Sequence, residues 1–341
     1  MNESNINSKK SIIQNIKNFK IYLNERFPIG KNSFFVLIFT LSGYIYTSLL
    51  YNSKIMYLFT NGVKITIFQY KIIALFIIIF MFFFQLRITD EFKDYEEDLK
   101  YRAYRPVQRG IISLKALGKI GIATVITQII LAHVIDPEII YFMIFVWIYM
   151  FLMAKEFFIK KWLTKRILIY ALSHVVIMVF ITLVIVEATQ YIVPKNIFDV
   201  FILQRYKHNI DFALIPLFAL NYLNGIVLEI GRKTRKADEE EHGVQTYSKL
   251  WGRKKAVIIL SLLFIIEYFF VILGLAHTYK QYFFFGGLTL LIILVVSIYF
   301  MVKFLKKNLS GKIVETMSGL WIIFSSMCMG LLPYLFFSLI K

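Results

Sequence analysis

The sequence predicts an all-α membrane protein, a bundle of nine transmembrane helices around an apolar central cavity. Hydrophobic residues make up 58% of the 341 residues, and the mean hydropathy is +0.66. Soluble domains contain only roughly 45–50% apolar residues. Helices are predicted because backbone in lipid must satisfy its own hydrogen bonds and no alternating barrel pattern occurs. The nine segments long enough to cross about 30 Å of hydrocarbon are residues 33–51, 67–87, 114–135, 138–155, 166–187, 210–229, 255–275, 281–303 and 314–339.

The basic residues predict the orientation of this bundle. The chain has 39 Lys and Arg residues and a net charge of +18. Nine crossings would place 31 of the 39 on the side that carries the N-terminus, and such an excess marks the cytoplasmic side. We therefore expect a cytoplasmic N-terminus in a multi-pass protein of the bacterial inner (plasma) membrane. Because the charge follows membrane sides, it indicates attraction to anionic lipid and argues against nucleic-acid binding.

Residues 1–32 are expected to form a separate unit ahead of a membrane domain over residues 33–341. The chain starts with polar residues, and apolar residues then recur at helical spacing among lysines from Ile12 to Leu23. This pattern predicts an amphipathic helix at the membrane interface. A simple continuation of the first span toward the N-terminus explains the pattern equally well.

A first charged segment, residues 87–110, stands out between two apolar runs. Its six acidic residues are Asp90, Glu91, Asp94, Glu96, Glu97 and Asp98, and its six basic residues are Arg87, Lys93, Lys100, Arg102, Arg105 and Arg109. If the helix continues to about residue 100, then Asp90, Glu91, Asp94 and Asp98 share one face. Crowded carboxylates need a cation, and Mg²⁺ is a hard ion that takes oxygen ligands. Lys93, Glu96 and Glu97 are expected to be ordinary solvated residues.

A second charged segment, residues 221–255, follows the sixth predicted span. It adds the acidic residues Glu229, Asp238 and Glu239, which are candidate metal ligands, and the basic residues Arg232 and Lys236. Both charged segments follow even-numbered spans, so both should emerge on the cytoplasmic side. They can therefore face each other across one site.

Charged residues at the mouth of an apolar bundle predict binding of a lipid diphosphate. Carboxylates would hold Mg²⁺, and Mg²⁺ would bind the diphosphate. Arg102, Arg105 and Arg109 would grip its oxygens through planar guanidinium groups, helped by Arg232 and Lys236, while the cavity takes the hydrocarbon tail. Metal and arginine stabilise charge on a departing diphosphate. We therefore expect Asp94, Asp98, Arg102 and Arg105 to be catalytic.

His174 and Glu267 are ionisable residues at some depth inside predicted spans. His174 in the fifth span is expected to be a hydrogen-bonded structural residue, although ionisable groups in membranes often serve function. Glu267 in the seventh span has two equal interpretations. It is either neutral and hydrogen-bonded or part of the pocket.

The first charged segment resembles the first motif of the UbiA-type intramembrane prenyltransferases, N-D-x-x-D-x-x-x-D. The matching run is residues 90–98, followed by the family-like Arg105-Pro106 and Gly110. The resemblance implies Mg²⁺-dependent prenyl transfer from a prenyl diphosphate, with Glu91, Asp94 and Asp98 as metal ligands. In place of the family's Asn and Asp this chain has Asp90 and Glu91.

The second charged segment resembles the family's second motif less closely. Residues 243–246 match the family's G-x-x-[ST], which places Glu239 at one motif Asp. Arg235 stands where the other Asp is expected, so Asp238 or Glu229 would have to substitute for it.

These observations together predict an enzyme that transfers a prenyl group from a prenyl diphosphate to a lipophilic acceptor, such as an aromatic compound. One alternative is a UbiA-type terpene cyclase, in which the prenyl cation is captured by its own chain. A membrane transporter without covalent chemistry is a third reading, but transporter sites usually lie near the bilayer midplane. Here the acidic residues gather at span ends.

Overall fold

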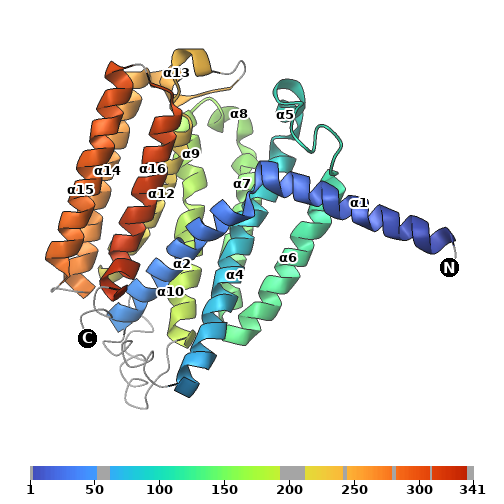
Figure 1. The fold of residues 1–341 in the computed structure, drawn as a ribbon, viewed down its shortest axis with the longest axis horizontal. Coiled ribbons are helices and arrows are strands. Elements are labelled where there is room, and N and C mark those ends of the chain that lie inside the picture. Colours follow the sequence, from blue (N-terminus) through green and yellow to red (C-terminus); the bar gives the residue numbers. More distant parts are fainter. Residues whose placement is uncertain are drawn as a thin grey trace.

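The computed structural model describes residues 3–51, 62–192, 212–240, 244–278, 282–307 and 309–335, and these ranges contain helices and no strand. Most helices run side by side in one bundle, and α1 extends beyond it (Figure 1). The α-helices are α1 Glu3–Arg26, α2 Ile29–Tyr51, α4 Gly62–Lys93, α5 Tyr95–Tyr101, α6 Leu114–Ile135, α7 Ile139–Ala154, α8 Lys160–Leu163, α9 Ile167–Val175, α10 Ile177–Ile192, α12 Ile215–Arg232, α13 Tyr247–Trp251, α14 Arg253–Thr278, α15 Phe283–Lys306 and α16 Lys312–Ser326. Short helical turns are η1 Glu156–Phe158, η2 Phe212–Leu214, η3 Ala237–Glu239 and the π-helical η4 Met327–Leu331.

The spans agree closely with the sequence prediction. In the described ranges, 8 helical segments are long and apolar enough to cross a membrane, and each overlaps a predicted span. The fourth predicted span is α7, which is apolar but has 16 residues. An all-helical, multi-pass membrane protein is thereby confirmed, whereas nine crossings and a cytoplasmic N-terminus stay predictions. Residues 210–211, 281 and 336–339 of the predicted spans lie outside the described residues.

The first span does not continue into α1, so that interpretation of the N-terminal pattern was wrong. Proline lacks a backbone N–H, and its ring disfavours helical backbone in the preceding residue. Pro28 therefore separates α1 from α2, which begins at Ile29. Tyr22 and Phe27 pack against α4, α6 and the connection between them. Residues 13 and 16 are exposed, and their place at the membrane interface stays a prediction.

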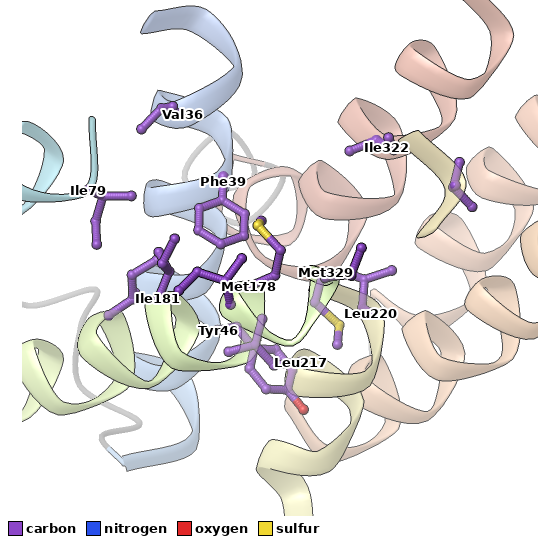
Figure 2. Close-up of a cluster of buried hydrophobic side chains, with 14 of the residues drawn as sticks. Val36, Phe39, Tyr46, Ile79, Met178, Ile181, Leu217, Leu220, Ile322 and Met329 are labelled. Carbon is purple, nitrogen blue, oxygen red and sulfur yellow. The ribbon is translucent and has the colours of Figure 1, made fainter. Parts of the chain in front are cut away.

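A large apolar cluster occupies the middle of the bundle. Figure 2 shows side chains from α2, α4, α10, α12, α16 and η4 meeting there. Phe39, Met178, Leu217 and Met329 are buried members of this cluster. Dense, dispersion-driven packing of this kind associates helices in lipid, where water supplies no hydrophobic force between them. The cluster gives the bundle the apolar interior that the sequence predicts, and the central cavity stays a prediction.

Hydrogen bonds between buried polar side chains add specific contacts between helices. Gln85 on α4 donates to Thr124 at 2.9 Å and to Gln128 at 2.7 Å, both on α6. Trp147 on α7 donates to Gln85 at 3.2 Å. Such interhelical bonds contribute on the order of 1 kcal/mol each in membranes. This network fixes the register of three neighbouring helices beneath the first charged segment.

One glycine allows α2 and η4 to approach closely. A Cβ atom on Gly330 would lie 2.2 Å from the carbonyl oxygen of Ser42, far inside van der Waals contact. Only glycine leaves room for the two backbones at this distance, as at many helix contacts in membranes. No feature of the sequence indicates which glycine serves this purpose.

Candidate active site

The two charged segments lie at the same end of the bundle. Figure 1 shows α5 and α13, which belong to the first and second segments, at the same end. Asp90 at the end of α4 and Arg232 at the end of α12 are close enough to attract each other electrostatically. The expectation that helix parity brings both segments to one side of the bundle is thereby borne out by the fold.

The helix of the second span continues almost to the predicted point, with a bend at Asp94. Its backbone leaves helical geometry there, with φ −95° and ψ 7°. Hydrogen bonds still run from Asp94 N to Asp90 O at 2.9 Å and from Asp98 N to Asp94 O at 2.8 Å. The bend reorients α5, so Asp98 does not simply extend the face that carries Asp90.

The acidic part of the site consists of Asp90 and Asp94 with Lys93 between them. The ammonium group of Lys93 lies 3.8 Å from Asp90 and 3.9 Å from Asp94, and its side chain is only 9% exposed. Arg87 pairs with Asp90 at 2.5 Å. Lys93 was expected to be solvated, and that expectation was wrong. Its position three residues after Asp90, on the same helix face, was the available signal.

Asp94 carries a negative charge that Lys93 offsets only in part. Its side chain is 37% exposed but sits among packed protein. This burial raises the pKa of the Asp94 carboxyl to about 6, and the carboxylates of Asp90, Asp98 and Glu97 add to the shift against the opposing Lys93. A carboxylate in such surroundings favours an additional cation beside it.

The basic part of the site is a cluster of guanidinium groups around Asp98. This carboxylate is 1% exposed, and it accepts from Arg102 at 3.0 Å and from Arg105. Burial, followed by the nearby charge of Arg26, lowers the pKa of Arg105, while Asp98 opposes the change. Two cations around one buried anion leave an excess of positive charge. This excess favours a bound anion such as a phosphate group.

Glu91 faces α1 instead of the other acidic residues. Its carboxylate is 0% exposed and accepts from Arg26 at 2.6 Å. A second contact joins Glu25 of α1 to Arg109 at 2.6 Å. The predicted single face of four carboxylates is therefore wrong, because Glu91 turns toward α1 and Asp98 turns toward the arginines. Glu96 and Glu97 are exposed, as expected.

Acidic residues of the second charged segment have mostly local partners. Glu229 pairs with Arg232 at 2.7 Å and with Lys233 at 2.6 Å. Asp238 pairs with Lys236 at 2.8 Å. Glu239 accepts from the backbone N–H of Gly311 at 2.8 Å, at the start of α16. Ion pairs two to four residues apart are set by the local backbone.

The expected motif positions of the second segment also have defined partners. Arg235 lies 3.8 Å from Glu315 on α16. Thr246 caps α13 by accepting from Lys249 N at 3.2 Å, and its hydroxyl donates to Glu240. Gly243 of the G-x-x-[ST] pattern lies outside the described residues. Among the residues that the structure describes, no three acidic, His or Cys side chains gather around one point as ligands for an ion.

A cluster that the sequence did not predict adjoins Lys93. Lys93 donates to the hydroxyl of Tyr170 on α9 at 2.6 Å, and the Tyr170 ring stacks on His174 with 3.9 Å between ring centroids. Glu156 in η1 lies 3.8 Å from His174. The members of this cluster come from α4, η1 and α9. The apolar sequence around these residues has no periodicity that would predict their contact.

The turn η1 holds Glu156 in a strained conformation. Glu156, Phe157 and Phe158 have φ values of 50°, 52° and 62°. Left-handed backbone costs a residue with a Cβ atom roughly 1–2 kcal/mol. Three such residues in a row persist only where the surrounding contacts hold them. Phe157 packs edge-on against both His174 and Tyr149, and these ring contacts provide that support.

Glu267 is a buried, hydrogen-bonded residue. It is 0% exposed and accepts a hydrogen bond from the indole of Trp321 on α16. This contact ties α14 to α16 and favours the structural interpretation of Glu267. Cys328 in η4 is also buried.

The fold and the site define a class: multi-pass helical membrane proteins with acidic and arginine-rich groups at one end of an apolar bundle. Comparison with known proteins gives the family. The sequence matches the model of the UbiA prenyltransferase family over residues 55–313, well over half of its length, and the chain belongs to this family. This membership supports prenyl transfer within a membrane. No curated protein matches the sequence.

A solved structure supports the assignment of the fold. A digeranylgeranylglyceryl phosphate synthase has 18% sequence identity to this chain, with a TM-score of 0.55. The similarity covers 92% of this chain and 98% of the synthase. It therefore includes nearly the whole bundle.

Proposed function

We propose that this protein transfers a prenyl group from a prenyl diphosphate to a lipophilic acceptor in the membrane, in a reaction that depends on Mg²⁺. Membership of the UbiA family supports the reaction class. One observation carries the proposal for this chain. The Asp90 and Asp94 carboxylates and the Arg102 and Arg105 guanidinium groups lie on one short stretch at the end of an apolar bundle.

The acidic part fits a magnesium ion that arrives with its substrate. Mg²⁺ is usually held by one or two carboxylates together with substrate phosphate oxygens and water. Asp90 and Asp94 supply two carboxylates. Burial, and then the neighbouring carboxylates, raise the pKa of Asp94, and a bound cation would offset this cost of ionisation. We therefore assign the ion to Asp90 and Asp94. When bound, Mg²⁺ would stabilise negative charge on the diphosphate.

The remaining predicted ligands are assigned other tasks. Glu91 anchors α1 through Arg26, and Asp98 holds Arg102 and Arg105 in place. Glu229 and Asp238 pair with neighbouring basic residues, and Glu239 binds the start of α16. These partners satisfy the carboxylates without an ion. We therefore assign no metal ligand to the second charged segment.

Diphosphate binding is assigned to Arg102 and Arg105, with Arg232 on the opposite side. A shared carboxylate keeps both guanidinium groups extended and ordered, which reduces the entropy lost on binding. Positive charge held in place before reaction stabilises the negative charge that grows as the C1–O bond breaks. Arg232 pairs with Glu229 but is also attracted by Asp90. Arg109 and Lys236 pair with Glu25 and Asp238, and we assign them only long-range attraction.

The apolar interior is assigned to the prenyl tail. The phenylalanine, tyrosine and methionine side chains of this interior would exclude water from the reacting carbon. Their aromatic faces would stabilise a carbocation by roughly 0.5–2 kcal/mol each. With the N-terminus in the cytoplasm, the charged end would face the cytoplasm, as expected for a water-soluble diphosphate product. Placement in a bacterial inner membrane is part of the same prediction.

The test is product analysis with purified protein in lipid nanodiscs. Prenyl diphosphates of several chain lengths are supplied with Mg²⁺ and membrane lipid extract, followed by mass spectrometry of lipid products and measurement of released diphosphate. We expect a prenylated acceptor and diphosphate release. A metal chelator should abolish both, and Asp94→Asn should lower both by on the order of 10²- to 10³-fold. Asp238→Asn serves as the matched acidic control.

Two other outcomes would overturn the proposal. A cyclised hydrocarbon formed from prenyl diphosphate without any acceptor would make the protein a terpene cyclase. No release of diphosphate with any chain length would exclude prenyl transfer and favour a transporter.

A further inference from the structure

Glu156 and His174 are two buried side chains near the charged site whose facing atoms make no hydrogen bond. Glu156 Oε2 and His174 Nε2 lie 3.8 Å apart, which is too long for a hydrogen bond. Within the described residues, neither atom has a hydrogen-bond partner, and both are shielded from solvent. Buried polar atoms in folded proteins are nearly always hydrogen-bonded. Two that face each other unpaired therefore require an explanation.

The hydrogen-bond partner of the His174 ring determines which of its two nitrogens carries the hydrogen. His174 Nδ1 lies 2.8 Å from the backbone carbonyl oxygen of Tyr170. A carbonyl oxygen only accepts, so Nδ1 carries the hydrogen of the neutral ring. Nε2 then presents a lone pair toward Glu156. A single proton placed between Nε2 and Oε2 would satisfy both atoms at once.

The position of Glu156 is fixed from two directions. The left-handed turn η1 sets its backbone, and the Tyr170 hydroxyl lies 3.5 Å from Oε1, the other carboxylate oxygen. Phe157 packs against the edge of the His174 ring. Costly backbone conformations of this kind cluster at functional sites, where they aim a side chain. Here the strained turn aims a carboxylate at an imidazole.

The charges around the pair are mixed. The titratable and charged groups that surround it are Lys93 and Asp90 on α4, Lys160 on α8, Tyr170 on α9 and Glu229 on α12. Burial raises the pKa of the Glu156 carboxyl, and the charges of Lys93 and Lys160 oppose this rise. The two lysines therefore favour the ionised carboxylate against the effect of burial. The pair is thereby left able to take up one proton.

A short polar path connects the pair to the charged site. Lys93 contacts Asp90 and Asp94, and it donates to Tyr170 at 2.6 Å. Tyr170 in turn reaches Glu156 and stacks on His174. Two side chains therefore separate the proposed metal ligands from the unpaired atoms.

We propose that Glu156 and His174 act together as the proton acceptor of prenyl transfer, an inference that rests on the proposed function. The C1–O bond of the prenyl diphosphate breaks, and its electron pair leaves with the diphosphate. A nucleophilic atom of the acceptor, such as a hydroxyl oxygen, forms the new bond to C1. The hydrogen of that atom leaves as a proton and comes to lie between Oε2 and Nε2. The acceptor is thereby restricted to compounds whose attacking atom carries a hydrogen.

The first test compares Glu156→Gln and His174→Gln with the wild type. Loss of a general base costs about 10²-fold or more in rate. We expect transfer to the acceptor to fall by about this factor, while the Kd of prenyl diphosphate with Mg²⁺ stays unchanged. The transfer rate of the wild type should rise with pH and then level off as the pair loses its proton. The variants should lack this rise.

Controls separate the proton acceptor from a merely structural role. Glu187→Gln removes a carboxylate from α10, in the same span, that bonds to Gln190, and it should keep the rate and the pH profile of the wild type. If Glu156→Gln transfers prenyl groups at the wild-type rate, or if its rate falls while the pH profile is unchanged, the inference is wrong. No transfer by the wild type to any acceptor overturns the proposed function itself.

A second measurement does not depend on turnover. Nitrogen NMR of protein with labelled histidine should show His174 Nε2 without a hydrogen at pH 7.5 and a protonation step at lower pH. Glu156→Gln should move the midpoint of that step by about one pH unit or more, because a facing carboxylate is removed. An identical midpoint in both proteins would show that the two side chains do not share a proton.

Discussion

The two charged segments have similar composition but different contacts. In the first, the buried carboxylates of Glu91 and Asp98 pair with arginines, and Lys93 reaches Tyr170, 77 residues away in the sequence. In the second, three of the five ion pairs join residues two to four apart in the sequence, and Asp238 is solvated. Buried charges need partners far more than solvated ones do. We therefore assign the metal to the first segment, and we propose that the second mainly supports the end of the bundle.

The largest effect is expected for Asp94→Asn. This change keeps the shape of the side chain but removes the charge that we assign to the metal. Loss of one such electrostatic group lowers turnover by on the order of 10²- to 10³-fold. The loss of turnover is measured as the rate of diphosphate release over a range of Mg²⁺ concentrations. Turnover close to that of the wild type would mean that the first segment holds no ion at Asp94.

A smaller effect, on binding and stability, is expected for Asp98→Asn. The substitution leaves Arg102 and Arg105 without their shared carboxylate, and breaking a buried pair costs about 3–5 kcal/mol. We expect a lower thermal unfolding temperature and a KM for prenyl diphosphate raised by about one to two orders of magnitude. An unchanged KM with lost turnover would instead make Asp98 a metal ligand.

Glu91→Gln should affect the docking of α1 more than the reaction. Arg26 loses its buried partner, so exchange of backbone hydrogens in α1 should speed up, with turnover reduced only a few-fold. The double variant Arg26→Gln with Glu91→Gln should regain part of the lost stability, because no unpaired buried charge remains. Loss of turnover equal to that of Asp94→Asn, with α1 still docked, would contradict the assignment of Glu91.

The smallest effects are expected at solvated acidic residues, one in each segment. Glu96→Ala and Asp238→Asn remove charges that no buried contact depends on, and turnover should change by less than about twofold. The same diphosphate release assay measures both. Strong loss of activity in Asp238→Asn would show that the second segment does supply a ligand, and the contrast between the segments would fail.

The spans could be predicted from the sequence because lipid imposes a length and a composition on each crossing. The predicted span over residues 114–135 coincides with α6, and the other seven long helices overlap their predicted ranges. The two charged segments could also be predicted from local composition, because dense charge between two apolar runs is unusual for an ordinary membrane loop. Their common end follows from the parity of the helix count.

Partners of individual charges could not be predicted. Helical spacing put Glu91 beside Asp90, but α1 packs against that side of α4 and supplies Arg26 from 65 residues away. Lys93 looked solvated in the sequence, although α9 brings Tyr170 against it. The bend at Asp94 also changes the direction of Asp98. Each of these outcomes depends on helices that are distant in sequence.

The sequence by itself determined the membrane class, the approximate spans and the region that carries charge, because these follow from local composition and the thickness of the bilayer. Only the tertiary structure decided that Glu91 and Asp98 pair with arginines, that Lys93 joins Asp94 to Tyr170, and that Glu156 faces His174. Electrostatic and hydrogen-bonding interactions act over a few ångströms in space. Helix packing sets those distances, and uniformly apolar helices carry little periodicity from which their packing could be deduced.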